Sequence, residues 1–241
     1  MAFYHTKLSI SSLSLYMLSL ASAAIITTSD DGYIREGQAT TVQGGGVTED
    51  LRVRSDGSAN NDNVRKAYLK FDLTGMNADL SQSATFNTTI SYRANIQNGN
   101  RIFYFYGLDA GFTPSGTELG TDWDETALTW NNAPANDSVT NIDRGFTDDA
   151  SLIYTASNQY GSAVGKEYNI TIPTLGDYVQ ADNTLTLMIS WSDTVEYGFG
   201  SKENSTEAYR PTLEFATIPE PGSVVLMLIG AAGLLIFRRR K

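Results

Sequence analysis

Lys66-Ala67-Tyr68-Leu69-Lys70-Phe71-Asp72-Leu73 alternates polar and apolar side chains along its whole length. Successive side chains of a β-strand point to opposite faces of its sheet, so this alternation is typical of a strand with one buried face. The residues expected in the core are Ala67, Leu69, Phe71 and Leu73. The residues expected to face solvent are Lys66, Tyr68, Lys70 and Asp72. The stretch therefore predicts a half-buried strand at the centre of a β-structured body.

The rest of the chain around this strand also favours β-structure. Clusters of Gly, Asn, Asp, Ser and Thr divide it into short segments rich in Val, Ile, Tyr, Phe and Thr. The predicted strands are Ala24–Thr28, Tyr33–Arg35, Asp50–Arg54, Lys66–Leu73, Ala84–Ala94, Ile102–Leu108, Leu152–Tyr154, Glu167–Ile172, Thr184–Trp191 and Thr212–Ala216. One short helix is predicted at Thr174–Ala181. Many short strands separated by turns indicate an all-β sandwich or barrel.

The segment Thr121–Pro134 holds two of the three Trp residues, Trp123 and Trp130, around an acidic turn. Leu128 and Trp130 alternate with polar neighbours, which predicts a short half-buried strand that ends before Pro134. We favour a structural clasp, in which buried indoles, carboxylates and amides fix a crossing of the chain. The alternative is an aromatic and carboxylate site for a ligand.

The charge of the chain limits its partners. It has 241 residues, with 17 Lys and Arg, 27 Asp and Glu and a formal net charge of −10. Lys7, the four basic residues of 238–241 and Glu220 lie outside the body, residues 24–217. The body therefore holds 12 basic and 26 acidic residues (17 − 5 and 27 − 1), a net charge of about −14. Such acidity would repel phosphates, which argues against nucleic acid.

The residue types needed for common catalytic sites are missing from the body. Cys is absent, and the single His is His5, near the N-terminus. The body therefore lacks a thiol nucleophile, a His general base and the usual zinc ligands, and we expect it not to be an enzyme. The catalytic alternative is a carboxylate-dependent polysaccharide hydrolase or lyase that uses Asp124 and Glu125. Neighbouring side chains on an extended chain point apart, so this dipeptide alone cannot form a facing carboxylate pair.

Five of the twelve basic residues of the body fall close together, within Arg52–Lys70. If the strands that carry them are neighbours, they form a basic patch on an acidic protein. Tyr104 and Tyr106 would extend this face as platforms for sugar rings if Phe103 and Phe105 are buried. The candidate ligand-binding residues are Arg52, Arg54, Lys66, Tyr68, Lys70, Tyr104 and Tyr106. The alternative is an ordinary solvated sheet face.

Two groups of oxygen-bearing side chains are candidates for calcium, the one cofactor that the sequence leaves open. Asp56–Asp62 places such side chains at alternate positions, but it lacks the Gly and the Glu that an EF-hand loop needs. We expect a polar hairpin loop there. Asp30, Asp31 and Glu214 would meet as a calcium site if the first and last strands of the body pair.

Both ends of the chain have the composition of targeting segments. Leu8–Leu20 is apolar and Ala21–Ala23 has small residues at a cleavage spacing, which predicts a signal peptide at 1–23. At the other end, Pro219-Glu220-Pro221 precedes the apolar run Val224–Phe237 and the basic end Arg238–Lys241. The run is short for a permanent anchor, which needs about 20 residues, and the terminal cations favour a cytoplasmic end.

The layout of residues 218–241 resembles a PEP-CTERM sorting signal, with its motif at Pro219, Glu220 and Pro221. The resemblance implies recognition by an exosortase in a Gram-negative bacterium. It also implies transient residence in the inner membrane through a short transmembrane helix. Export to the cell surface or the extracellular matrix would follow.

Several pieces of the body occur in the order of a known domain family. They are Asp31–Gly37, Leu51–Arg54, Arg65–Leu73, Trp123–Pro134, Phe199–Glu203 and Arg210–Leu213. Together they resemble the DNRLRE domain, which is similar to jelly-roll carbohydrate-binding modules. The resemblance implies a single jelly-roll-type β-sandwich at 24–217 that binds polysaccharide without catalysis, acidic exopolysaccharide being the ligand expected here. A purely structural surface protein without a glycan ligand is the alternative.

Overall fold

The computed structural model describes residues 22–44, 47–55, 63–94, 100–138, 145–159 and 163–218. Its strands are β1 (Ser22–Thr27), β2 (Asp30–Arg35), β3 (Asp50–Val53), β4 (Arg65–Asp72), β5 (Ala84–Arg93), β6 (Asn100–Leu108), β7 (Ala150–Gln159), β8 (Glu167–Ile172), β9 (Thr184–Trp191), β10 (Tyr197–Gly200) and β11 (Thr212–Thr217). Its 3-10 turns are η1 (Glu36–Gln38), η2 (Leu175–Asp177) and η3 (Glu207–Tyr209). Within these ranges, no helix is long and apolar enough to cross a membrane.

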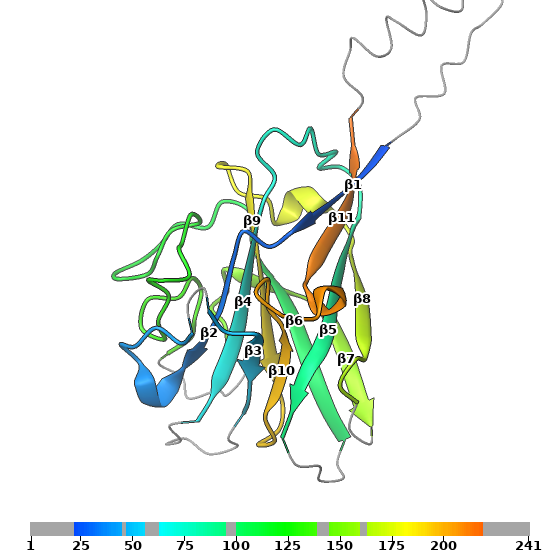
Figure 1. Cartoon of the computed structure of the whole chain (residues 1–241). Helices are drawn as coiled ribbons and strands as arrows, with labels where there is room; N and C mark the ends of the chain where they lie inside the picture. The colour runs from blue at the N-terminus through cyan, green and yellow to red at the C-terminus, as the bar shows by residue number, and fades with distance from the viewer. Residues whose placement is uncertain are drawn as a thin grey trace, which may run out of the picture. The chain divides into compact units, whose positions relative to one another are not determined.

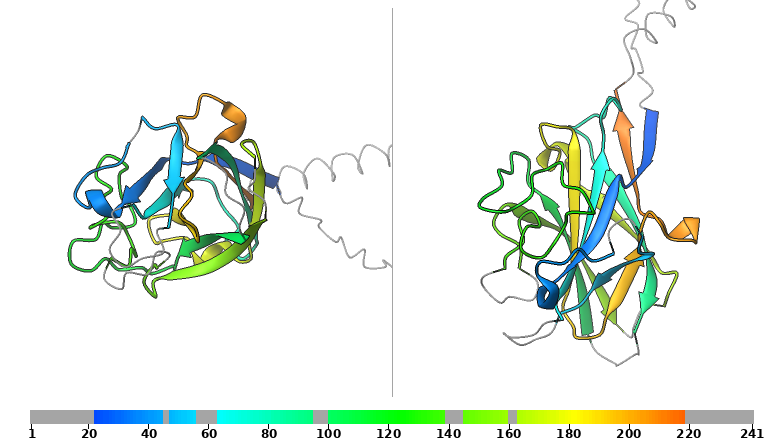
Figure 2. Two further views of the ribbon diagram at one scale, coloured as in Figure 1. Left: turned by 90° about the horizontal axis from the view of Figure 1, so that it is seen from below. Right: turned by 60° about the vertical axis from the view of Figure 1, so that its left-hand side comes forward.

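The strands form two antiparallel sheets (Figure 1). The first, called the β4 sheet, has the order β2-β4-β9-β6-β7. The second, called the β5 sheet, has the order β1-β11-β5-β10-β3, and β8 also pairs with β5. Figure 2 shows the two sheets as layers around a shared interior. The prediction of an all-β sandwich is confirmed.

The main core fills the space between the two sheets. Leu69 and Phe71 point into it from β4, as their alternation predicted, and both are fully buried. The Phe71 ring meets the Phe86 ring of β5 edge-on, with centroids 6.0 Å apart. Phe103 of β6 stacks on Trp191 of β9 at 3.9 Å. Burial of these apolar rings is the main force that holds the sheets together, and the aromatic contacts add to it.

A second core lies on the outer face of the β4 sheet. The chain between β6 and β7 crosses that face and carries Trp123 and Trp130, which are buried as expected of a clasp. They join a cluster that includes the fully buried Tyr68 of β4. The prediction that Lys66, Tyr68 and Lys70 face solvent is therefore wrong, because the crossing chain covers the face to which they point. We call this covered surface the clasped face.

Sequence patterns located the strands better than the other elements. Each of the ten predicted segments overlaps an observed strand. The short strand β10 was missed because half of its four residues are glycine. The helix predicted at Thr174–Ala181 is wrong, since η2 is a single turn and Val179 pairs with Leu185 in a β-bridge. The strand predicted at Leu128–Trp130 is also wrong, because this piece is irregular.

The strands run between two opposite ends of the sandwich. β1 pairs with β11, so Ser22 lies opposite Thr217 at one end. β5 starts beside β11 near that end and reaches Arg93, beside β10, at the other. A strand of this length spans about 30 Å at about 3.3 Å per residue. The strand pairs and both cores of the described residues lie within Ser22–Ile218, which forms one compact unit.

Candidate functional site

The Trp-rich segment forms a clasp and not an open aromatic site. Trp123 Nε1 donates a hydrogen bond to Thr186 Oγ1 of β9 at 2.9 Å. The Trp123 ring meets the Tyr68 ring edge-on, with centroids 6.2 Å apart. The Tyr68 hydroxyl donates to the Pro134 carbonyl at 3.1 Å, and burial raises the pKa of Tyr68 well above its usual value. Because Trp123 and Trp130 are 2% and 6% exposed, neither can offer its face to a sugar ring.

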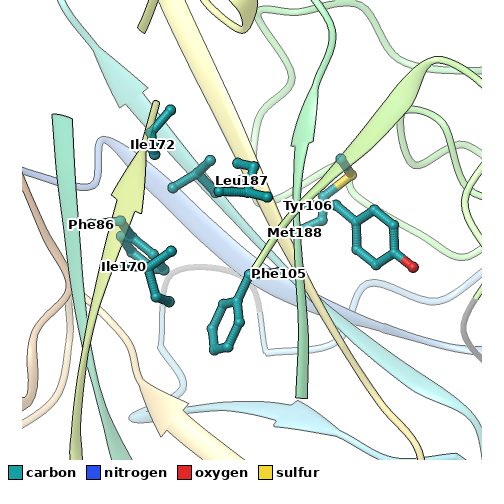
Figure 3. Close-up of a pocket in the computed structure, with 8 residues that line it drawn as sticks. Phe86, Phe105, Tyr106, Ile170, Ile172, Leu187 and Met188 are labelled. Carbon is teal, nitrogen blue, oxygen red and sulfur yellow. The ribbon is translucent and has the colours of Figure 1, made fainter. Parts of the chain in front are cut away.

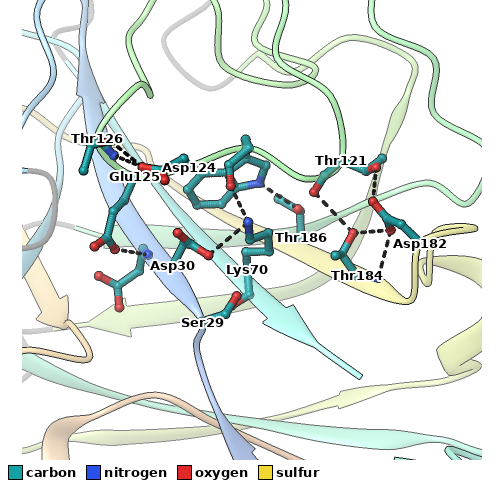
Figure 4. A network of polar contacts seen from close by, with 12 residues as sticks. Ser29, Asp30, Lys70, Thr121, Asp124, Glu125, Thr126, Asp182, Thr184 and Thr186 are labelled. Carbon is teal, nitrogen blue, oxygen red and sulfur yellow. Dashed lines mark hydrogen bonds and ion pairs between the residues drawn. The ribbon is translucent and has the colours of Figure 1, made fainter. Parts of the chain in front are cut away.

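Lys66 and Lys70 also serve the clasp. Lys70 Nζ forms an ion pair with Asp30 Oδ2 at 2.9 Å and donates to the Trp123 carbonyl (Figure 4). Lys66 Nζ donates to Asn136 Oδ1 at 2.7 Å. A buried ammonium group is tolerated only when its donors are paired, and these pairs bind the crossing chain to β4. The two lysines are therefore structural and are not available to a ligand.

The acidic turn of the clasp is occupied in the same way. Asp124 Oδ1 accepts hydrogen bonds from the Thr126 hydroxyl at 2.5 Å and the Thr126 NH at 2.6 Å, and these bonds lower the pKa of Asp124. Glu125 Oε2 accepts from the Asp31 NH at 3.1 Å and pairs with Lys202 Nζ at 2.6 Å. Each carboxylate holds a different partner, so the geometry does not support a facing pair for catalysis.

Tyr104 and Tyr106 point to the outer face of β6, as predicted, because their neighbours on that strand are buried. Tyr106 packs on Phe146 of the clasp, with ring centroids 4.9 Å apart. Both tyrosines are half-buried and belong to the β4 sheet, whereas Arg52 lies in β3 of the β5 sheet. The predicted platform is therefore not joined to Arg52.

Arginines gather at one end of the sandwich, opposite to the end where Ser22 meets Thr217 (the lower end in Figure 1). Antiparallel strands alternate in direction, so the last residues of some strands lie beside the first residues of others. Tyr197 of β10 pairs with both Arg93 of β5 and Val53 of β3, and so joins these strand ends. We call this region the arginine end, and it is defined by Arg35, Arg52, Arg54, Arg65 and Arg93.

Arg52 is the member whose position is best defined by its contacts. Its guanidinium group pairs with Asp50 Oδ2 at 3.1 Å and with Glu196 Oε1 at 2.5 Å. It also lies 3.6 Å from the centre of the Tyr92 ring. A Cβ at Gly198 would come within 3.0 Å of Tyr92 and 3.1 Å of Asp50, so the glycine gives these two side chains room to lie close to β10. The result is a cation on an aromatic ring, with the Arg52 side chain 26% exposed.

The positive charges of the arginine end act on one another. The pKa of Arg65 lies below its usual value, mainly because Arg65 is partly buried. The positive charges of Arg35, Arg54 and Arg52 lower this pKa further. In the described part of the chain, the buried Nε atoms of Arg54 and Arg65 have no hydrogen-bond partner. Glu196 pairs with Arg65 as well as with Arg52, so acids offset part of the positive charge here, although five of the twelve basic residues of the body lie at this end.

The predicted calcium trio does not come together. The first and last strands do pair, but Asp30 and Asp31 lie in β2 of the β4 sheet, whereas Glu214 is exposed on β11 of the β5 sheet. Asp30 is bound to Lys70. Across the ranges that the structure describes, no three acidic side chains form a metal-binding group. The other candidate, Asp56–Asp62, lies outside those ranges.

An apolar gap opens between the sheets near β6, β8 and β9 (Figure 3). It has no room for a water molecule. Sugar binding needs polar partners as well as space, so this gap is a packing feature and not a glycan site. Its lining residues are Phe86, Phe105, Tyr106, Ile153, Ile170, Ile172, Leu187 and Met188.

Sequence reasoning missed several residues of the arginine end, namely Arg35, Arg93, Tyr92 and Glu196. A signal was present, because Arg35 and Arg54 end predicted strands, Arg93 is one residue before the end of another, and Arg65 directly precedes a fourth. Alternation of strand direction would have placed these ends together. The missed strand β10, which joins β3 to β5, hid that relation.

Two family models match the chain. The model described as carbohydrate-binding module family 96 matches residues 22–217, which is most of the chain. The model described as the PEP-CTERM protein-sorting motif matches residues 217–241. The second match includes Pro219, Glu220 and Pro221, which lie outside the described residues, and such a motif marks a secreted protein sorted to the cell surface. Neither match carries the DNRLRE name. No curated protein matches the sequence.

Proposed function

The chain belongs to carbohydrate-binding module family 96, and on this basis we propose that its arginine end binds an acidic polysaccharide at the bacterial surface. The role is to retain polysaccharide and not to cleave it, as in a non-catalytic module. The observation that carries the proposal is the gathering of five arginines at one end of a body with a net charge of about −14.

The chemistry of the arginine end suits an acidic glycan. A guanidinium group has a planar fork of donors that matches a carboxylate in two parallel hydrogen bonds. Uronate residues carry such a carboxylate on every ring. Tyr92 lies directly beneath Arg52, and an aromatic ring offers a flat surface for a sugar. Because Asp50 and Glu196 already hold Arg52 in place, less side-chain entropy is lost when a ligand binds.

The other candidate surfaces have less to offer a glycan. The lysines of the clasped face are enclosed by the crossing chain, and the indoles beside them are buried. The apolar gap between the sheets is too narrow for water. The choice of the arginine end therefore rests on exposed charge next to an aromatic ring.

The proposed path to the surface uses both ends of the chain. A signal peptide at 1–23 directs export, and an exosortase recognises Pro219–Pro221 while Val224–Phe237 resides in the inner membrane of a Gram-negative bacterium. Intact-mass analysis of the exported native protein tests this path. We expect a chain that lacks Phe237–Lys241. Recovery of these residues from cells with an active sorting enzyme would contradict it.

Affinity electrophoresis of the Ser22–Ile218 unit tests the ligand. A polyuronate in the gel is expected to retard the parent, and a neutral glucan is not. Retardation should weaken as salt rises, since exposed charges are screened over about 8 Å at physiological ionic strength. Replacing Arg52 and Arg54 together by Ala is expected to abolish it. The control replaces Lys166 and Arg210 by Ala, which changes the net charge equally but leaves the five arginines in place.

The two double variants separate the possible results. If only the Arg52→Ala/Arg54→Ala variant loses retardation, the result supports the arginine end as the binding surface. Equal loss in the control would mean that net charge, not this surface, causes the retardation. A parent that prefers neutral glycans at every salt concentration would rule out an acidic ligand.

A further inference from the structure

Two carboxylate oxygens outside the arginine end are buried without a partner among the described residues. Asp31 is 1% exposed, and within the described residues its Oδ1 atom has no hydrogen bond. Glu203 Oε2 is shielded from water in the same way and also has none there. Burial of an unpaired carboxylate oxygen is costly, so two of them in one cluster favour a partner that carries positive charge. We propose that Asp31 and Glu203 together bind a calcium ion.

The fold brings these two carboxylates together from distant parts of the chain. Asp31 lies in β2, and Glu203 lies in the turn that follows β10. Asp31 Oδ2 is held by the Lys202 NH at 2.7 Å and by the Thr28 hydroxyl at 3.0 Å, which leaves Oδ1 as the oxygen without a donor. Burial raises the pKa of Asp31 to about 7, and the negative charge of Glu203 contributes to this rise. The two carboxylates therefore act on each other electrostatically.

The net charge of the cluster fits a divalent cation. Asp31, Glu125 and Glu203 supply three negative charges and Lys202 supplies one positive charge when all four are ionised. Lys202 Nζ pairs with Glu125 Oε2 at 2.6 Å and with Glu203 Oε1 at 3.5 Å. The ammonium group thus uses the other oxygens and leaves Asp31 Oδ1 and Glu203 Oε2 for a second cation. One divalent ion balances the remaining charge of −2, whereas a single proton would leave −1.

The type of ligand atom selects among divalent ions. Carboxylate oxygens suit hard cations, whereas zinc sites in proteins favour nitrogen and sulfur. Calcium accepts six to eight oxygens in flexible geometry, including water, whereas magnesium demands a regular octahedron. Two protein carboxylates are few for a calcium ion, so the site is expected to be weak. We expect a dissociation constant on the order of 10⁻⁴–10⁻³ M, the range of extracellular calcium modules.

A calcium ion at this position would connect separate parts of the fold. Asp31 belongs to the β4 sheet, and Glu203 continues from β10 of the β5 sheet. Glu125 of the clasp accepts from the Asp31 NH at 3.1 Å, so the clasp is tied to the same point. A ligand that binds only the folded state raises its stability. Calcium would therefore stabilise the contact between the two sheets and the clasp.

Thermal unfolding and calorimetric titration of the full chain in non-ionic detergent test this site. At about pH 8 Asp31 is ionised, since its pKa is about 7. We expect calcium chloride to raise Tm with half-saturation near the dissociation constant above. Sodium chloride at equal ionic strength should not do so, and magnesium chloride should have a smaller effect. Glu203→Gln is expected to abolish both the Tm shift and the binding heat.

The matched control is Glu214→Gln, which removes an exposed acid on β11. It should respond to calcium like the parent. The Glu203 side chain is 23% exposed, so its substitution should leave the fold intact, and titration of the parent does not depend on any variant. Absence of binding heat in the parent, or an equal calcium response in Glu203→Gln, would overturn the proposal. A parent stabilised by acid and not by calcium would assign a proton to this pair instead, and would also overturn it.

Discussion

The clasped face and the arginine end both collect positive side chains but use them in opposite ways. Lys66 and Lys70 on the clasped face are fully or nearly buried, and their ammonium groups bind oxygen atoms of the crossing chain. Arg52 at the arginine end keeps 26% of its side chain exposed while two carboxylates and an aromatic ring hold it. Coverage by a distant segment therefore decides whether a cation on a strand can contact a ligand.

The two regions also use different cations for physical reasons. A lysine ammonium is compact, and a few oxygen atoms close around it can pair all its donors. A guanidinium group has five donors in a plane, so inner partners can bind one side while another side stays free. Substitutions in the core, in the clasped face, in the acidic cluster and at the arginine end should therefore have different effects on stability and binding.

Phe71→Ala has the largest expected effect on stability and gives a reference for the other variants. Phe71 faces the main core from β4, next to Lys70, which faces the clasp. Removal of the ring leaves a cavity and should reduce the free energy of unfolding by about 3–5 kcal/mol. Denaturant unfolding measures this loss. A midpoint equal to that of the parent would mean that the inner face of β4 has been assigned wrongly.

Lys70→Met tests whether the clasped face depends on its buried ammonium. The variant keeps an apolar stem of similar length but leaves Asp30 and the Trp123 carbonyl without a donor. We expect a loss of about 1–3 kcal/mol in the free energy of unfolding and unchanged retention by polyuronate. The control is Lys166→Met, an exposed lysine whose loss should matter by less than about 0.5 kcal/mol. Equal effects of the two variants would show that the buried pairs do not hold the clasp.

Asp31→Asn tests the acidic cluster beside the clasp by its pH dependence. The folded state raises the pKa of Asp31 from 3.8 to about 7, so the folded protein binds an extra proton between these values. The contribution of Asp31 to the free energy of unfolding is therefore complete below pH 3.8 and is lost as the pH rises to about 7. In calcium-free buffer, the parent should lose up to about 1.4 kcal/mol per pH unit relative to Asp31→Asn between about pH 5 and pH 7. Parallel stability curves would contradict this assignment.

Arg52→Ala should have the smallest effect on stability and completes the contrast. Its partners Asp50 and Glu196 stay partly exposed, and pairs of this kind contribute about 0–1 kcal/mol. Retention by polyuronate should nevertheless fall clearly. The pattern is the reverse of that expected for Lys70→Met, which affects stability but not binding. A large loss of stability in Arg52→Ala would show that the arginine end is a structural element like the clasp.

The inner face of the sandwich was predictable because its signal is local. The alternation around Leu69 and Phe71 specifies which side chains share a face, and both residues are in the core as predicted. The outer face of the same strand was not predictable from this signal. Lys70 contacts Trp123, 53 residues further along the chain, and alternation contains no information about such a crossing. The clasp was foreseen as an element, but the face that it covers was not.

Only part of the candidate site could be foreseen. Arg52 was named from its strand, yet it was joined to Lys66 and Lys70 because all three are close in sequence. The structure separates them, since β3 belongs to the other sheet. Glu203 was missed entirely, because its relation to Asp31 depends on β10, a strand too short and too rich in glycine to be recognised.

The pairing of β11 with β5, which leads from one end of the sandwich toward the other, has a mechanical consequence. A chain held through Thr217 and pulled by polysaccharide at the arginine end would carry the load lengthwise along β11 and β5. Hydrogen bonds between antiparallel strands lie across the strand direction, so this load shears the ladder and does not open it bond by bond. Resistance to such a pull is set by the rate of forced unfolding and not by equilibrium stability. Under the proposed function, a pull by polysaccharide would therefore meet the β11–β5 ladder in its shear direction.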